Sequence, residues 1–472
     1  MDEAGVSLAY ARSLAQGLGM VPQAGQQKVE AFVNPLWVFL HVLPIRIKIF
    51  HLYATPKIMG ALLTLGTYYI LKEVLKRPFR TSPLGVLLIL SLLSSNPYWV
   101  RWLNSGLENP LYVFLVMVQA ALLIKLYKNR KGWLIFVAGS LAGLLILTRP
   151  DGLLLAGLFP LGLMFLKERF NQKIDYLAVW GLGWVLTAGF YQGFRRFYFD
   201  LLWPTPFAVH QALDIRWVLD LHKWYQLYAS TLGPLGIALL LNLLLGIIWL
   251  WWQRRIDAPL LILLLHLGGA TLVFLLMPSG ALYGYRFASP FILLIYPVSG
   301  IVFRRLMEEP RLEAWRAQIH QGLKYGAVIL MFLLPLWHYE GLFMTQGERV
   351  DYVVLGELDA AGLQQLATVP LESVMVPYVG GLLWEDSVEV HEYRGLLDTA
   401  LTIPLAMKDT LGYRVHVIQE LSPDLLVLPQ VWLDQVGLST DSSFHQNYQA
   451  RELTTPFVKD DWKVFERIGN SP

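Results

Sequence analysis

The chain contains a succession of apolar stretches that are long enough to cross a lipid bilayer. A transmembrane helix needs about 20 mainly apolar residues, and stretches of this kind recur through the first 340 residues. Charged residues make up 15% of the 472 residues and the mean hydropathy is +0.46, whereas a soluble domain carries about 25% charged residues. We therefore expect a polytopic membrane protein that is embedded in a lipid bilayer.

Ten stretches are predicted to form membrane-spanning helices. They are residues 57–74, 82–99, 109–126, 133–148, 152–167, 176–195, 233–252, 258–277, 287–304 and 323–340. An eleventh stretch, residues 34–49, is weaker because it contains Arg46 and Lys48. Several stretches are short for a full crossing, so tilted or broken helices are expected among them.

Basic residues gather in five loops between the predicted spans, and cytoplasmic loops are the ones that carry such an excess. The five clusters are Lys72/Lys76/Arg77/Arg80, Lys125/Lys128/Arg130/Lys131, Lys167/Arg169/Lys173, Arg254/Arg255 and Arg304/Arg305. They alternate along the chain if each of the ten stretches crosses once, and residues 34–49 are then re-entrant or interfacial; if residues 34–49 do cross, one of the other early stretches does not. This pattern predicts a multi-pass protein of the plasma (inner) membrane, with the intervening loops outside.

Residues 341–472 have a different composition and are predicted to form a small soluble α/β domain outside the cytoplasm. Strand-like runs occur at residues 374–378, 388–393, 425–428 and 462–468, with helical stretches between them. About 130 residues are enough to bury a core. We therefore divide the chain into an outer amphipathic loop (1–33), a multi-span membrane domain (34–340) and a soluble tail (341–472).

Composition excludes several kinds of chemistry. The chain has no cysteine, so thiolate nucleophiles, disulfides and Cys-based metal sites are impossible. Its net charge of +3 is too small to indicate a nucleic-acid partner. No metal ligands are assigned and no cofactor is required by the sequence, although a divalent cation remains an option.

Two acidic features in the predicted outer regions are candidates for function. Asp2 and Glu3 are adjacent carboxylates, of which one can act as a general base or metal ligand while the other tunes it; a frayed acidic terminus is the alternative. Glu108 precedes a membrane helix that Asn109, as the predicted N-cap, and Pro110 would begin. A carboxylate at this depth must be paired or hydrated, so structural and functional roles both remain open.

Two arginine motifs also lie in predicted outer loops. Arg149 and Asp151 flank Pro150 in a turn; a hairpin with a local ion pair would explain them, but charges at membrane depth favour function. Tyr285 and Arg286 begin a late span, where the planar fork of an arginine matches phosphate oxygens. Contact of Arg286 with lipid head groups is the alternative.

Two histidines are weaker candidates. His210 lies in the longest outer loop, with Arg195 and the Trp203–Pro206 segment, and indicates a lid or a contact with anionic lipid. His266 falls inside a predicted span, where a hydrogen-bonded packing role is favoured over a proton relay. Spacing alone does not assign either residue a function.

In their order along the chain, these motifs resemble those of the GT-C superfamily of membrane glycosyltransferases. The similarity extends to its terminal arabinofuranosyltransferase-like and dolichyl-phosphate-mannose mannosyltransferase-like branch. The matching segments are Asp2–Ala4, Tyr10–Leu14, Gly17–Gly19, Val29–Trp37, Ser105–Glu108, Thr148–Gly152 and Tyr285–Phe287. The chain departs from the family at His210, where a lysine is usual, and at residues 278–281, where an acidic residue is missing. The family has a span before the acidic pair, so a leading helix before Met1 is expected.

The resemblance implies a mainly α, polytopic helical bundle that transfers a sugar, with inversion, from a polyprenyl-phosphate carrier. The acceptor would be a glycan, lipid or protein of the cell envelope. Asp2 or Glu3 would be the catalytic base. The implied substrate-binding residues are Glu108, Arg149, Asp151, His210, Tyr285 and Arg286.

Two other functional classes are compatible with the sequence. One is a transporter or flippase for an envelope lipid, which would need a polar path through both leaflets. The predicted cytoplasmic loops offer mainly Lys and Arg and few acids. The other is a catalytically silent membrane scaffold, which the missing acid near Gly280 would suit.

Overall fold

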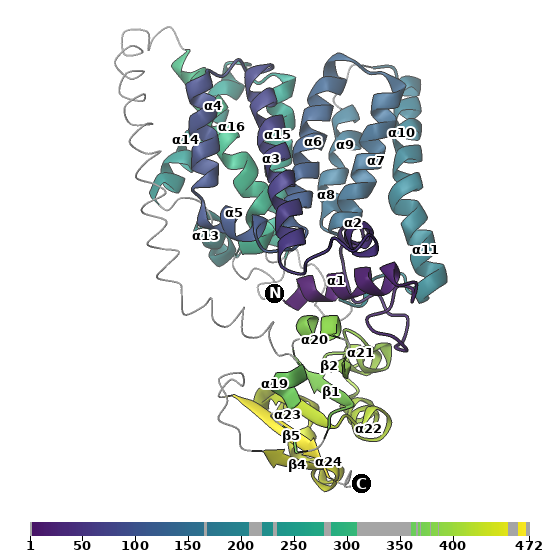
Figure 1. The fold of residues 1–472 in the computed structure, drawn as a ribbon. Helices are drawn as coiled ribbons and strands as arrows, with labels where there is room; N and C mark the ends of the chain where they lie inside the picture. The colour runs from purple at the N-terminus through teal and green to yellow at the C-terminus, as the bar shows by residue number, and fades with distance from the viewer. Residues whose placement is uncertain are drawn as a thin grey trace. The chain divides into compact units, whose positions relative to one another are not determined.

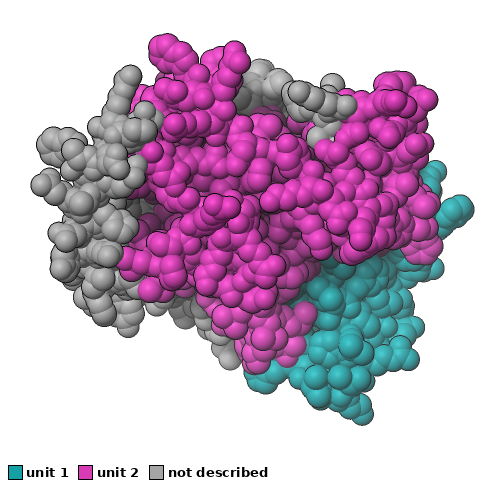
Figure 2. Space-filling model, turned by 90° about the horizontal axis from the view of Figure 1, so that it is seen from above, with its two compact units in different colours: residues 1–51, 193–212, 346–472 teal, residues 52–192, 213–345 magenta. Residues whose placement is uncertain are grey.

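The computed structural model describes most of the chain as two compact units (Figure 2). The described residues are 2–164, 168–206, 220–229, 234–277, 285–308, 360–364, 367–368, 370–377, 379–385, 387–451 and 461–468. Unit 1 comprises residues 1–51, 193–212 and 346–472. Unit 2 comprises residues 52–192 and 213–345.

Unit 2 is a bundle of helices (Figure 1). Its helices are α3 (Ala54–Lys76), α4 (Pro83–Ser94), α5 (Pro97–Leu103), α6 (Asn109–Lys128), α7 (Gly132–Thr148), α8 (Gly152–Ala156), α9 (Leu158–Met164), α10 (Phe170–Trp184), α13 (Leu221–Ala229), α14 (Pro234–Trp252), α15 (Ala258–Leu276) and α16 (Ser289–Met307). Among the described residues, four helices are long and apolar enough to cross a membrane: α3, α6, α15 and the helix Tyr285–Met307 that contains α16. These four match the predicted spans 57–74, 109–126, 258–277 and 287–304 in length and composition.

The predicted span 82–99 is not one straight helix. It is a pair, α4 and α5, that bends by 73° and would count as a fifth, broken span. The break lies at Asn96, whose side chain accepts a hydrogen bond from the backbone N–H of Trp99 at 2.9 Å and donates to the Tyr296 hydroxyl at 3.0 Å. Because Pro97 follows and lacks an N–H, a new helix begins there.

Several other predicted spans form shorter apolar helices. The stretch 133–148 is the 17-residue α7, and the stretch 152–167 divides into α8 and α9. The stretch 176–195 lies in a continuous run of α10, a π-helical turn (η1, Val185–Gly189) and α11 (Phe190–Phe199). The stretch 233–252 lies in α14, of which Leu239–Trp252 is the part found as a shorter apolar helix, and 323–340 lies outside the described residues.

The weak apolar stretch 34–49 forms α2 (Pro35–Arg46) in unit 1. Its 12 residues extend for about 18 Å at 1.5 Å per residue. A hydrocarbon core is about 30 Å thick, so α2 is too short to cross it. This length agrees with the prediction that the segment does not cross fully.

Helices α7 and α10 pack closely through glycines. A Cβ atom on Gly139 would overlap the Trp180 carbonyl oxygen, and one on Gly183 would overlap the Phe136 carbonyl oxygen. Both contacts are with backbone atoms, which cannot move aside as a flexible side chain can. Small residues are what allow two membrane helices to approach in this way.

Unit 1 contains a five-stranded mixed sheet in the order β2-β1-β3-β5-β4. Its strands are β1 (Ser373–Val376), β2 (Glu389–Glu392), β3 (Leu425–Pro429), β4 (Tyr448–Arg451) and β5 (Trp462–Arg467). Strands β1, β2 and β3 are parallel, and β5 runs antiparallel to both β3 and β4. All four predicted strands are confirmed; β4 was not predicted because its sequence is polar and short.

Helices flank the strands of unit 1. They are α19 (Ala360–Gln364), α20 (Gly380–Glu385), α21 (Thr399–Ala406), α22 (Thr410–Val415), α23 (Gln430–Val436) and α24 (Ser442–Asn447). Because side chains alternate along a strand, Val374 and Val376 enter one hydrophobic core while Met375 enters another. The first core also contains Tyr10 of α1 (Asp2–Ala15) and Phe32, so the N-terminal segment and the sheet share one core.

Substitution at Gly183 is expected to test the close packing of α7 and α10. Gly183→Ala should lower the melting temperature of the full chain in detergent by several degrees, since overpacking costs typically about 1–3 kcal/mol. Gly181→Ala, on the same helix, is the control, because a Cβ there meets no atom within 4 Å. Alanine is a better helix former than glycine, so the control should be neutral or stabilising. Equal melting temperatures for both variants would contradict the packing.

Candidate functional site

Four charged side chains from three segments gather at one end of unit 2. Glu108 precedes α6, Arg149 and Asp151 lie in the turn between α7 and α8, and Arg286 precedes α16. Helices α5 and α8 mark this end of the bundle in Figure 1. The structure therefore brings together four of the residues that the sequence nominated.

Glu108 and Arg286 form a buried ion pair. Nη2 of Arg286 donates to Oε1 of Glu108 at 2.7 Å, and the side chain of Glu108 is fully buried. The two residues are 178 positions apart in the sequence, so this contact joins the start of α6 to the start of α16. A buried charge is tolerated only when it is paired, which explains why a carboxylate can occupy this position.

Arg149 and Asp151 form a second buried pair with two parallel hydrogen bonds. Nε and Nη2 of Arg149 donate to the two Asp151 oxygens at 3.0 and 3.1 Å. The guanidinium carbon lies 4.2 Å from the centre of the Phe287 ring, and the Arg286 guanidinium carbon lies 6.0 Å from the same ring. Phe287 thus holds both arginines in one cluster. Nη1 of Arg149 is buried and has no hydrogen-bond partner among the described residues.

The charges of the cluster act on Glu108. Burial alone would raise the pKa of its carboxyl group, but the positive charges of Arg286 and Arg149 and the hydrogen bond from Arg286 hold that pKa below its ordinary value. Glu108 is therefore ionised at neutral pH. Two arginines and two carboxylates make the cluster formally neutral.

The helix starts around the cluster differ from the expected pattern in one respect. Asn109 was predicted to be the N-cap of α6, but Glu108 occupies that position and Asn109 is the first helical residue. The Asn109 amide instead donates to the Arg286 carbonyl oxygen and to the Ser289 hydroxyl, both at 3.0 Å. The side chain therefore tethers α6 to α16, which sequence spacing does not reveal.

Tyr285, also nominated from the sequence, lies beside the cluster in a strained conformation. Its φ is +60°, a region that few residues other than glycine adopt. Its ring lies 4.4 Å, centre to centre, from that of Tyr98 in α5. Strain of this kind often accompanies functional positions.

The remaining candidates belong to unit 1. Asp2 and Glu3 begin α1 in unit 1, and their side chains are outside the described set. His210 lies outside the described residues. Arg195 of α11 pairs with Glu30 through Nη2 at 3.1 Å within unit 1, which gives it a structural partner rather than a lipid.

Sequence analysis missed Lys223, which is fully buried on α13. Its Nζ donates to the Leu275 carbonyl oxygen at 3.0 Å and to the Met277 carbonyl oxygen, at the C-terminal end of α15. A cation is stabilised there because the last carbonyls of a helix carry negative partial charge. The local sequence gives no signal of this role, because the two acceptors lie 52 and 54 positions further along the chain.

Comparison with known proteins adds no assignment: no protein-family model and no curated protein sequence matches the chain. Within the part of the chain that the structure describes, no group of three or more His, Asp or Glu side chains is placed to hold a metal ion. The divalent cation remains a prediction. The chemistry of the site rests on the geometry of its own residues.

Removal of one charge from the Glu108–Arg286 pair should destabilise the protein more than removal of both. Glu108→Gln leaves Arg286 without its buried counter-charge, and loss of one partner of such a pair typically costs about 3–5 kcal/mol. The double variant Glu108→Gln/Arg286→Gln should recover part of that loss in thermal unfolding. The exposed pair Arg304–Glu308 is the control, and Glu308→Gln should have little effect. Strictly additive losses would show that the pair is not coupled.

The contribution of Glu108 should also depend on pH. Because its pKa is lowered in the folded state, the stabilisation is present above the ordinary pKa and is lost as the pH falls through the folded value. The difference in melting temperature between the wild type and Glu108→Gln should therefore be constant near neutrality and shrink below about pH 4.5. A difference that grows on acidification would be incompatible with an ionised Glu108.

Proposed function

We propose that the chain is a membrane glycosyltransferase that moves a sugar from a polyprenyl-phosphate carrier to an envelope acceptor. The observation that supports it most is the cluster of Arg149 and Arg286 over the Phe287 ring. Buried guanidinium groups at the end of an apolar bundle suit a ligand with a phosphate next to a long apolar chain. The motif order described above supports the same assignment.

Arg149 offers the donor that a phosphate oxygen would satisfy. Its Nε and Nη2 are used by Asp151, whereas Nη1 is buried without a described acceptor. Arg286 keeps its charge beside Glu108 and can share it with a developing phosphate. Glu108 and Asp151 hold the two arginines in place and, in this proposal, bind sugar hydroxyl groups.

The proposed reaction is a single displacement with inversion. The acceptor hydroxyl oxygen forms a bond to the anomeric carbon while the bond from that carbon to the phosphate oxygen breaks. The phosphate monoester leaves on the polyprenol, and the arginines stabilise the negative charge that it gains. The hydroxyl proton passes to a carboxylate, which we assign to Asp2 or Glu3 on the basis of the resemblance.

This proposal places the reaction on the outer face of the plasma (inner) membrane. The described basic residues Lys125, Lys128, Arg304 and Arg305 lie at the C-terminal ends of α6 and α16, whereas the cluster lies at the opposite ends. Positive loops remain in the cytoplasm, so the charged cluster would face outward. A lipid-linked donor needs no nucleotide-binding fold at that face.

Substitution of Arg286 tests the phosphate role. In proteoliposomes supplied with polyprenyl-phosphate sugars that carry a pentose or a hexose, Arg286→Gln should reduce transfer by about 10²–10³-fold. Arg286→Lys should retain part of the rate, because the charge remains while the planar fork is lost. Arg304→Gln, at the basic end of α16, is the control and should keep full activity. Unchanged transfer by folded Arg286→Gln would contradict the assignment.

The base assignment is tested separately with Asp2→Asn/Glu3→Gln. Loss of a general base typically costs about 10²–10⁴-fold in rate, with little effect on the melting temperature at an acidic terminus. Release of sugar to acceptor would be followed with labelled donor. Undiminished transfer would remove Asp2 and Glu3 from the mechanism. If no lipid-linked donor supports transfer by the wild type, the result would favour a transporter or a scaffold over a glycosyltransferase.

A further inference from the structure

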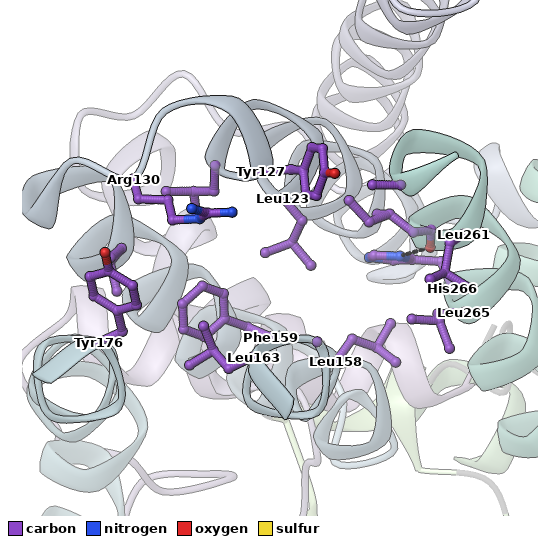
Figure 3. A pocket seen from close by; sticks show the side chains of 15 residues that line it. Leu123, Tyr127, Arg130, Leu158, Phe159, Leu163, Tyr176, Leu261, Leu265 and His266 are labelled. Atoms are coloured by element: carbon purple, nitrogen blue, oxygen red, sulfur yellow. Dashed lines mark hydrogen bonds between the residues drawn. The ribbon is translucent and has the colours of Figure 1, made fainter. Parts of the chain in front are cut away.

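Unit 2 contains a cavity at the other end of α6 from the charged cluster. Its volume is about 280 Å³, just below the ~300–1,000 Å³ typical of small-molecule sites. It lies between the C-terminal half of α6, helix α9, helix α10 and the N-terminal half of α15 (Figure 3). Leu123 on its wall is 15 residues along α6 from Glu108, which is about 22 Å at 1.5 Å per residue.

The wall of the cavity is almost entirely apolar. Leucine, isoleucine and aromatic side chains such as Leu123, Phe159 and Leu265 form most of it. Tyr127 and Leu261 on the wall are 44% and 40% exposed, so the cavity reaches the surface of unit 2. A chain of CH₂ groups would find apolar contacts throughout and could extend out of the opening.

His266 is a polar residue on this wall, beside Tyr127, Arg130 and Tyr176. The ring of His266 is fully buried and extends from α15 toward the cavity interior (Figure 3). Its Nδ1 lies 2.7 Å from the Ile262 carbonyl oxygen, and since a carbonyl can only accept, Nδ1 is the donor. In the neutral ring Nε2 is then an acceptor, and it is buried without a partner among the described residues.

The charged residues beside the cavity do not favour an anionic ligand. Arg130 is the cationic group on the cavity wall, and it forms an ion pair with Glu168. The pair is formally neutral, so it provides little net attraction for a carboxylate or phosphate. An acceptor nitrogen in an apolar cavity selects instead for a neutral group that carries an O–H or N–H donor.

We propose that this cavity binds a long-chain alcohol, with the hydroxyl group donating to Nε2 of His266 and the chain lying along the apolar wall. The hydroxyl would lose its hydrogen bonds with water on entry, and Nε2 replaces one of them. The same bond satisfies a nitrogen that otherwise has no described partner. This site is independent of the proposed transferase function.

The experiment uses the full chain in nanodiscs and a photoreactive analogue of 1-decanol. The competitors are 1-decanol, 1-methoxydecane and decanoate. The methyl ether keeps the oxygen and the chain but has no proton to donate. We expect labelling on α9 and α15, and competition by 1-decanol that is about tenfold stronger than by the ether or by decanoate.

His266→Phe should weaken 1-decanol about tenfold and remove its advantage over the ether. His41→Phe is the matched control, because His41 is also fully buried, its Nδ1 lies 2.8 Å from the Trp37 carbonyl oxygen, and its Nε2 has no described partner. It lies on α2 and does not line the cavity. The control should therefore bind 1-decanol as the wild type does.

Gly162→Leu is a second variant that keeps the proposal testable if His266→Phe does not fold. Gly162 lines the cavity, and a Cβ there meets no atom within 4 Å, so the leucine should fill the space and reduce all labelling. Equal competition by alcohol and ether in the wild type would overturn the role of His266. Stronger competition by decanoate would show an anion site, and unchanged labelling in Gly162→Leu would show that the ligand is elsewhere.

Discussion

The buried ion pair between Glu108 and Arg286 fixes the geometry on which the charged end of unit 2 depends. Each charge alone would cost several kcal/mol in an apolar bundle, so the two helix starts that carry them must remain together. Asn109 adds two hydrogen bonds across the same junction. Arg149 is then held over Phe287, which follows Arg286 directly, so the third segment depends on the position of the first two.

Unit 1 shows how the two ends of the chain depend on each other. The outer strand β2 would expose unpaired backbone groups, which is a liability in any sheet. Gln23 covers it: its amide nitrogen donates to the Val388 carbonyl oxygen at 2.8 Å, and its oxygen accepts from the Val390 N–H at 2.9 Å. Gln26 donates to the Val390 carbonyl oxygen at 3.1 Å. The N-terminal segment therefore completes the sheet as well as sharing its core.

Sequence patterns predicted elements that depend on local composition. Long apolar runs predicted α3, α6, α15 and α16, and alternating runs predicted β1, β2, β3 and β5. The bend at Asn96, the short edge strand β4 and the burial of Lys223 depend on distant partners, and no local pattern encodes them. The division of the chain into two units also depends on contacts between residues far apart in the sequence, because unit 1 combines residues 1–51, 193–212 and 346–472.

The members of the cluster and the local Arg149–Asp151 pair could be predicted from the sequence, but the pairing of Glu108 with Arg286 could not. Charges in apolar surroundings marked Glu108, Arg149, Asp151 and Arg286 individually. Which carboxylate pairs with which arginine follows from the packing of α6 against α16 and from the sharp turn at Gly152, where a Cβ would lie 2.6 Å from the Leu145 carbonyl oxygen. That Nη1 of Arg149 has no hydrogen-bond partner among the described residues can be seen only in the folded structure.

The cost of burying a charge determines which polar groups occur at the charged cluster and which occur at the cavity around His266. At the helix ends, charged groups are retained because each has a partner, and in the proposed function a phosphate oxygen would add an acceptor for Nη1 of Arg149. His266 lies eight residues into α15, about 12 Å from its start, where only a group that can be neutral is cheap to bury. In the two proposals, the phosphate therefore belongs to the charged end of the bundle, and an uncharged chain with a single donor suits the interior.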